Sequence, residues 1–148
     1  MANANDPTLA FEVHEEASLI VLKHGPGAPS ARDWATYLDA FRSLSLRLSE
    51  MRILVLTEGG RPLREQQAQL NKVIQGRSIR TAIVSSSMAV RFVIAGFALV
   101  NPGIRGFAST HHAEAFDYLG LKETERLLVD VILLRISRVL ASAKEQVV

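Results

Sequence analysis

One short stretch decides the fold: Arg52-Ile-Leu-Val-Leu-Thr-Glu-Gly-Gly-Arg-Pro62. Its four consecutive apolar residues, Ile53 to Leu56, are too few for a helix and suit a strand that is buried on both faces. Gly59 and Gly60 end this strand, and a helical pattern begins a few residues later. Strand, glycine turn and helix form the repeating unit of an α/β domain, in which ligand sites tend to lie at the carboxyl ends of the strands.

The rest of the chain alternates between the same two kinds of pattern. Two closely spaced apolar segments before this stretch predict an antiparallel hairpin at one side of the sheet. The expected strands cover residues 9–14, 18–23, 52–57, 80–85 and 104–108, and the expected helices cover residues 30–50, 63–75, 88–100, 109–119 and 122–144. This order predicts an α/β fold: a mixed four- to five-stranded sheet covered by helices, with a long C-terminal helix.

The composition sets limits on the class of protein. A chain of 148 residues, 48% hydrophobic and 22% charged, is the size of one globular domain. The net charge is only +2 and the basic residues do not cluster, so no nucleic-acid partner is expected. The absence of cysteine excludes disulfides, thiolate catalysis and cysteine-ligated zinc.

The sequence also carries expectations about location and domain boundaries. No apolar run approaches the roughly 20 residues of a membrane span, and residues 1–7 lack the features of a signal peptide. A cytoplasmic protein of bacterial type is therefore expected. Residues 1–8 are expected to be disordered and residues 9–121 to form the α/β domain. The C-terminal helix, within residues 122–148, is expected to pack on that domain.

Three local sequences, together with the order of elements, carry a resemblance to a known family. They are Leu54-Val-Leu-Thr-Glu-Gly-Gly, Ile83-Val-Ser-Ser-Ser, and Phe97-Ala-Leu-Val-Asn-Pro-Gly-Ile-Arg-Gly-Phe107, which leads to Tyr118-Leu-Gly. Over residues 9–121 the chain resembles the STAS fold (sulfate transporter and anti-sigma-factor antagonist), and more closely the small bacterial STAS/SEC14-like proteins. The resemblance implies a regulatory module that works by binding other proteins.

The chain departs from that family at its switch. In STAS regulators the helix after the third strand opens with an Asp-Ser-x-Gly motif whose serine is phosphorylated, which exchanges one partner for another. Here the corresponding residues read Pro62-Leu-Arg-Glu-Gln66, and no serine, threonine or tyrosine occurs from Glu58 to Arg77. Regulation by that phosphorylation is therefore not expected.

A weak candidate site for an anionic small molecule lies at the predicted strand ends. The glycine turn precedes a helix and offers backbone N–H groups beside two arginines, and a serine run ends the neighbouring strand. The candidate residues are Gly59, Gly60, Arg61, Arg64, Ser85, Ser86 and Ser87. The plainer interpretation is that the glycines serve backbone geometry and the serines cap a helix.

Two helices carry more apolar surface than one neighbour covers. The segment Met88–Val100 has one charge, Arg91, and the last helix is apolar over more than half its circumference. Either the two helices cover each other within one chain, or they bind a partner, which includes a second copy of the chain. The predicted interface residues are Val90, Ile94, Phe97, Leu127, Val131, Leu134 and Leu140.

No arrangement of residues in the sequence predicts catalysis, a cofactor or a metal site. The adjacent pair His111 and His112 does not converge on one ion, because neighbouring helical residues point about 100° apart. The sequence therefore predicts a non-enzymatic interaction or regulatory module. The alternative is a protein that binds a nucleotide or a lipid at the strand ends.

Overall fold

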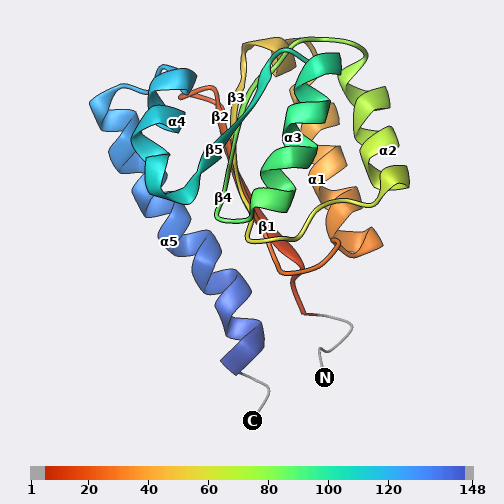
Figure 1. The fold of residues 1–148 in the computed structure, drawn as a ribbon, viewed down its shortest axis with the longest axis vertical. Coiled ribbons are helices and arrows are strands. Elements are labelled where there is room, and N and C mark those ends of the chain that lie inside the picture. Colours follow the sequence, from red (N-terminus) through yellow and green to blue (C-terminus); the bar gives the residue numbers. More distant parts are fainter. Residues whose placement is uncertain (1–5, 146–148) are drawn as a thin grey trace.

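The computed structural model describes residues 6–145, except for the side chains of Phe92, Phe97, Val100 and residues 142–145. Residues 1–5 of the segment 1–8 that was predicted to be disordered, and residues 146–148 of the C-terminal segment 122–148, lie outside the described residues. The strands are β1 Leu9–His14, β2 Leu19–His24, β3 Arg52–Leu56, β4 Arg80–Ser85 and β5 Ile104–Ala108 (Figure 1). The helices are α1 Ala31–Leu44, α2 Arg64–Ile74, α3 Met88–Val100, α4 His112–Leu119 and α5 Glu123–Glu145, with 3₁₀ turns at Ser45–Glu50 and Ser109–His111.

The five strands form one mixed sheet whose spatial order follows the chain, β1-β2-β3-β4-β5. β1 and β2 pair antiparallel, with Leu9 opposite His24, as the predicted hairpin requires. β2, β3, β4 and β5 are parallel, and a helix lies in each connection between them. The α/β fold with a five-stranded mixed sheet and a long C-terminal helix is confirmed. Because β2 to β5 run the same way, their carboxyl ends lie along one edge of the sheet.

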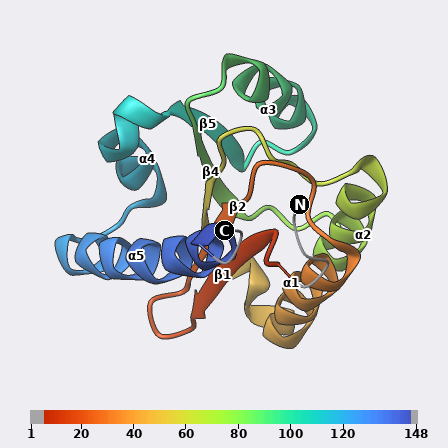
Figure 2. The same ribbon diagram turned by 90° about the horizontal axis from the view of Figure 1, so that it is seen from below.

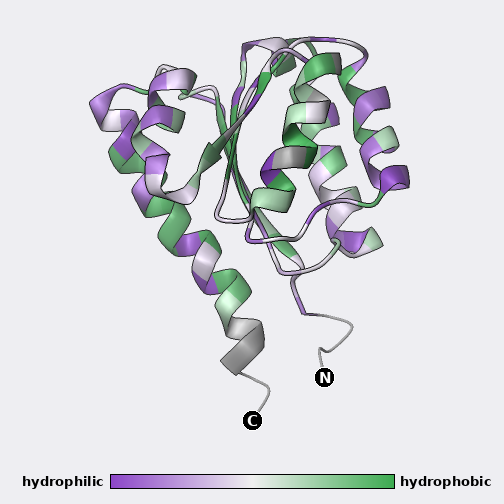
Figure 3. Cartoon of the chain, viewed as in Figure 1, coloured by the Kyte–Doolittle hydropathy of each residue, from purple (hydrophilic) through white to green (hydrophobic). Residues whose placement is uncertain are grey.

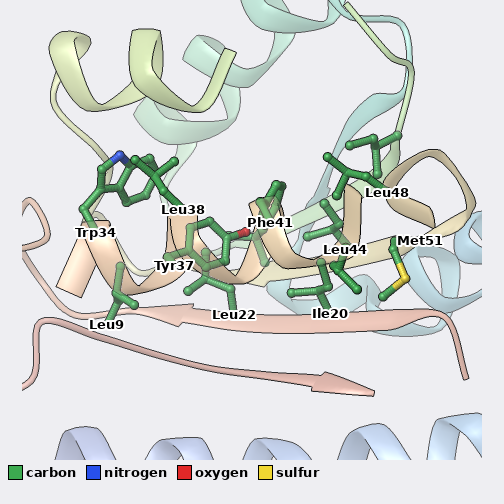
Figure 4. Packing of buried hydrophobic residues seen from close by; sticks show 13 residues of the cluster. Leu9, Ile20, Leu22, Trp34, Tyr37, Leu38, Phe41, Leu44, Leu48 and Met51 are labelled. Atoms are coloured by element: carbon green, nitrogen blue, oxygen red, sulfur yellow. The ribbon is translucent and has the colours of Figure 1, made fainter. Parts of the chain in front are cut away.

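The first face of the sheet packs against α1 through an aromatic core (Figure 4). Alternate residues of the strands, such as Ile20 and Ile53, point to this face because successive side chains of a strand alternate. From α1, Trp34, Tyr37 and Phe41 stack in sequence, with ring centroids 4.8–5.4 Å apart. Their spacing of three and four residues places them on one side of the helix.

The second face of the sheet packs against α4 and α5. The intervening strand residues, such as Leu19 and Leu54, meet Val129, Ile132 and Ile136 of α5, all of which are buried. This core is almost entirely aliphatic. Two residues of α5 that are three to four apart always share one side of the helix, so the buried stripe continues along it.

Arg52, at the start of β3, joins the last helix to the sheet. Its Nη2 donates to Glu125 Oε2 at 2.7 Å and to the carbonyl oxygen of Ala17 at 2.6 Å. Its Nη1 donates to the carbonyl oxygen of Gly120 at 3.2 Å, at the end of α4. The hydrogen bond from Arg52 lowers the pKa of the Glu125 carboxyl below its usual range. One guanidinium thus links the β1–β2 turn, α4 and α5.

The two apolar helices, α3 and α5, lie on opposite faces of the sheet (Figures 1 and 2). Figure 3 shows α3 as mostly hydrophobic, whereas α2 beside it is mainly hydrophilic on its visible side. α3 packs on β5, where Ile94 Cγ2 lies 3.2 Å from the position that a Cβ on Gly106 would take. The interpretation in which α5 covers α3 within one chain is therefore wrong. No helix of the described residues combines the length and apolarity that crossing a bilayer demands.

The start and end of α1 differ from the sequence expectation in detail. Ser30, the first residue of the predicted segment 30–50, is the N-cap of α1, since its Oγ accepts from the N–H of Asp33 at 3.1 Å. The carboxylate of Asp33 does not complete a capping box; it accepts from the N–H of Thr8 at 2.7 Å and from its hydroxyl at 2.6 Å. The α-helix ends at Leu44, and Ser45–Glu50 continue as a 3₁₀ turn rather than as one helix to Glu50.

Candidate functional site

A cavity of about 730 Å³ lies on the first face, at the carboxyl ends of the parallel strands. Its lining comes from α2, α3, the loops after β2 and β3, and one residue each of β2, β3, β4 and β5. Figure 2 shows α2 and α3 standing apart on this face of the sheet. We call this cavity the strand-end pocket. Its apolar lining residues are Val55, Leu63, Ile83, Val90, Val93, Ile94 and Ile104. Its polar lining residues are His24, Thr57, Arg61, Arg64 and Gln67, and Gly27, Ala28, Gly59, Gly60 and Pro62 complete it.

The floor of the strand-end pocket depends on a close approach of two backbones at Gly60. A Cβ on Gly60 would lie 1.9 Å from the carbonyl oxygen of Gly25 and 2.6 Å from that of Gly27. Only glycine allows the turn after β3 to pack against the loop after β2 in this way. Gly59 has a φ of 151°, which a residue with a side chain rarely adopts.

Thr57 fixes the shape of this turn. It is buried, and its N–H donates to the carbonyl oxygen of Val84 at 3.1 Å, which extends the pairing of β3 and β4. Its hydroxyl donates to the carbonyl oxygen of Gly60 and accepts from the N–H of Gly59. Both hydrogen-bonding capacities of the hydroxyl therefore serve the turn.

Gln66 anchors the start of α2 at the mouth of the pocket. The side chain is buried, and its Oε1 accepts from the N–H of Leu63 at 2.9 Å. Its Nε2 donates to the carbonyl oxygen of Pro29 at 2.9 Å, and its own carbonyl oxygen accepts from Trp34 Nε1 at 3.0 Å. The sequence analysis did not single out Gln66. The signal was present, because a glutamine at the third helical position commonly satisfies the N–H of the residue before the helix.

His24 is a buried polar residue in the lining of the strand-end pocket. The side chain is only 7% exposed, and its Nδ1 has no hydrogen-bond partner among the described residues. Burial lowers the pKa of the imidazole to about 4, because the charged form loses its hydration. His24 is therefore neutral at pH 7, with one nitrogen that donates and one that accepts.

The sequence analysis assigned His24 to the loop that follows β2. The structure places it as the last residue of that strand, which explains why it was missed as a site residue. The available signal was its position at the end of an apolar strand, β2, which pairs in parallel with β3, the strand that ends at Leu56 before the glycine turn.

Two arginines stand at the mouth of the pocket. Arg61 lies in the turn and Arg64 begins α2; both are exposed. No aspartate or glutamate occurs among the lining residues that the structure describes. The N-terminus of α2 adds partial positive charge at the same place. The mouth of the pocket therefore favours an anion, whereas its walls favour an apolar group.

The predicted ligand residues divide into two groups. Gly59, Gly60, Arg61 and Arg64 line the strand-end pocket, and the three serines do not. Ser85 is fully buried and its Oγ accepts from the N–H of Ser87 at 3.1 Å; Ser87 Oγ accepts from the N–H of Val90 at 3.3 Å. Ser86 Oγ bonds to Glu58 Oε2. These hydroxyls start α3 and stabilise the neighbouring turn, as the plainer interpretation has it.

The predicted interface residues lie in two separate places. Val90 and Ile94, on α3, line the strand-end pocket, and the side chain of Phe97 lies outside the described residues. On α5, Leu140 is partly buried against the second core. The remaining three are exposed on α5: Leu127 at 63%, Val131 at 48% and Leu134 at 61%. We call these three residues the outer stripe.

Comparison of the chain with models of known protein families, with curated proteins and with solved structures finds no match in any of the three. The geometry of the molecule is therefore the basis for the function proposed below.

Proposed function

We propose that this protein binds a small amphipathic anion, such as a carboxylate with an apolar tail, in the strand-end pocket. The observation that carries the proposal is a cavity of about 730 Å³ at the parallel strand ends whose lining combines apolar side chains with two arginines. Ligand pockets have volumes of roughly 300–1,000 Å³ and mostly apolar walls with a few polar groups.

The division of chemistry within the pocket supports this class of ligand. Val93, Ile83 and Ile104 offer an apolar wall, and Arg61 and Arg64 offer two cations at the mouth. A ligand with an apolar body and a terminal carboxylate satisfies both parts at once.

The proposal is for binding rather than catalysis. The hydroxyl of Thr57 is occupied by the turn, and the described lining offers no carboxylate to orient His24 as a base. His24 is also neutral and held in an apolar environment, which suits recognition of a polar group.

The test compares ligands that share only part of this chemistry. The full chain is titrated with decanoate, 1-decanol and adenosine monophosphate, and the Tm is followed with calorimetry on the same samples. At ten times Kd, decanoate is expected to add about 1.4 kcal/mol of stability, or roughly 3–6 °C in Tm. The alcohol, which lacks the charge, is expected to bind more weakly.

A matched pair of variants locates the site. Arg64→Gln, at the mouth, is expected to weaken decanoate binding several-fold, whereas Lys72→Gln, exposed on the same helix and outside the pocket, is expected to leave it unchanged. Binding of the nucleotide in preference to decanoate would replace the proposed ligand class. Absence of binding by all three probes would refute the proposal.

A second candidate function, an interaction module of the STAS type without the phosphoacceptor serine, rests on a different observation. The outer stripe of α5 exposes three large apolar residues on the side opposite Val129 and Ile132, which are buried. Exposed apolar surface of this kind is typical of protein contacts. Pull-down partners that are lost on Leu134→Asp and retained on Arg64→Gln would favour this function over ligand binding.

A further inference from the structure

The outer stripe of α5 lies on the face of the helix that points away from the sheet. Leu127, Val131 and Leu134 follow the spacing i, i+4, i+7 and so share one side. The buried residues Val129 and Ile136 lie on the opposite side. Figures 1 and 2 show no other element of the fold outside α5.

Charged residues border the outer stripe in a symmetric arrangement. Glu123 lies one turn before Leu127, and Arg138 lies one turn after Leu134. Both side chains are exposed, and neither forms an ion pair with another described residue. Both pairs, 127 with 134 and 123 with 138, are centred between residues 130 and 131.

This symmetry matches the helix to an antiparallel copy of itself. When two such helices pack about a two-fold axis at that centre, Leu127 meets Leu134 of the partner subunit. Glu123 then meets Arg138 of the partner subunit, at both ends of the contact. A parallel arrangement would instead oppose like charges at each end, which is unfavourable. The charges therefore favour the antiparallel arrangement and a second copy of the chain as the occupant.

We propose that two copies of this protein form a dimer through antiparallel contact of their α5 helices, centred between Asp130 and Val131. Two-fold dimers are the commonest closed assembly, and their contacts are self-complementary in this sense. The Asp130 carboxylates of the two chains approach each other at the edge of the contact. The proposal deepens the second candidate function and does not depend on ligand binding in the strand-end pocket.

Sedimentation of the full chain tests the contact. The wild-type protein is expected to sediment as a dimer of the 16.2 kDa chain at micromolar concentration. Leu134→Asp is expected to give monomer. The control is Leu46→Asp, because Leu46 is also an exposed leucine (88%) and lies outside α5; it is expected to remain dimeric. Circular dichroism of each variant establishes that it is folded.

Charge reversal tests the antiparallel register. Glu123→Arg and Arg138→Glu, each alone, are expected to raise the dimer Kd about tenfold. Each single change places two like charges, at positions 123 and 138 of the two chains, opposite each other at both ends of the contact. The double variant restores the pairs and is expected to return to the wild-type Kd. Asp130→Asn is expected to tighten the dimer.

Three results would overturn the proposal. They are a wild-type protein that is monomeric at 200 µM, a dimer that survives Leu134→Asp, and charge reversals that fail to compensate each other. Decanoate binding is measured on the same variants. Loss of the dimer with retained binding separates this proposal from the function of the strand-end pocket.

Discussion

The two apolar helices, α3 and α5, differ in where their uncovered apolar surface lies. Both carry more apolar surface than one neighbour covers, and they lie on opposite faces of one sheet (Figure 1). α3 leaves space between itself and α2, so part of its surplus, Val90 and Val93, lines the strand-end pocket, while Leu99 is exposed. α5 packs closely on the sheet, so its surplus is the outer stripe, exposed on the far side. Excess apolar surface on a helix thus indicates either a cavity or a docking face, and only the packing around the helix decides which.

The position of each helix on the sheet accounts for this difference. α5 lies over β1 and β2, on the side of the sheet opposite to β5, and Glu12 and Arg52 add ion pairs to it at 2.9 Å and 2.7 Å. α3 lies at the edge, over β5. The glycine at 106 lets it approach that strand closely, and no helix then fills the gap toward α2.

The largest expected effect distinguishes the two sides of α5. Ile132→Ala removes a fully buried side chain and is expected to lower the free energy of unfolding by about 2–5 kcal/mol. Leu134→Ala, in the outer stripe, is expected to change it by less than about 0.5 kcal/mol. Urea unfolding of the dilute protein, where association adds nothing, measures both. Equal losses would mean that the outer stripe is covered within the chain.

A smaller effect is expected when a side chain is enlarged in the packed second core and in the strand-end pocket. Val129→Phe adds volume to a fully buried position and is expected to cost about 1–3 kcal/mol. The same change at Val93 extends into the strand-end pocket and is expected to change stability by less than about 1 kcal/mol. It should also weaken decanoate binding. A Val93→Phe variant that binds decanoate as tightly as wild type would place the ligand elsewhere.

His24 gives the pocket side a dependence on pH. Its pKa is about 4 in the folded protein and 6.5 in the unfolded chain, so only the unfolded chain takes up the proton between these values. The contribution of His24 to the free energy of unfolding is therefore fully present above pH 6.5. It falls by about 1.4 kcal/mol per pH unit between pH 6.5 and 4. Glu125, whose pKa is lowered, loses its contribution at lower pH. His24→Phe is expected to abolish the fall above pH 5 in urea titrations, and an unchanged slope would contradict the assignment.

The smallest expected effect concerns the attachment of α5. Glu125→Gln weakens the pair with Arg52 and the capping bond from the N–H of Lys122, at 2.8 Å, and is expected to cost about 1 kcal/mol. Asp39→Asn, in an exposed ion pair with Arg42, is the control and is expected to cost less than about 0.5 kcal/mol. If both variants cost the same, Arg52 does not anchor α5.

Much of the fold was predictable because it depends on local pattern. Strand alternation, the glycines at 59 and 60 and the helical stripe of Trp34 and Phe41 predict the elements and the mixed sheet. The end of α1 at Leu44 was not predictable, since apolar spacing continues through Leu48 and the change to a 3₁₀ turn depends on tertiary packing.

The pocket was predictable only in part. The glycine turn and its arginines were predicted because ligand sites tend to lie at the carboxyl ends of parallel strands. Four of the seven predicted ligand residues line the cavity. The rest could not be read from the sequence, because the face that each helix covers depends on how the chain crosses the sheet. The side on which each connection crosses the sheet also determines that α3 and α5 lie on opposite faces, with the pocket between α2 and α3. The predicted strand 18–23 ended one residue too early, and His24 was therefore not recognised as a buried residue.

The order of the chain also has a consequence for how the protein is made. Among the described residues, the second face of the sheet is covered by α4 and α5, which follow every strand in the sequence and so are synthesised after them. Leu19, Val21 and Leu54 therefore stay bare on the nascent chain until the final helix leaves the ribosome. At about 5–20 residues per second, that interval lasts several seconds, during which these apolar side chains lack the helices that cover them in the folded protein.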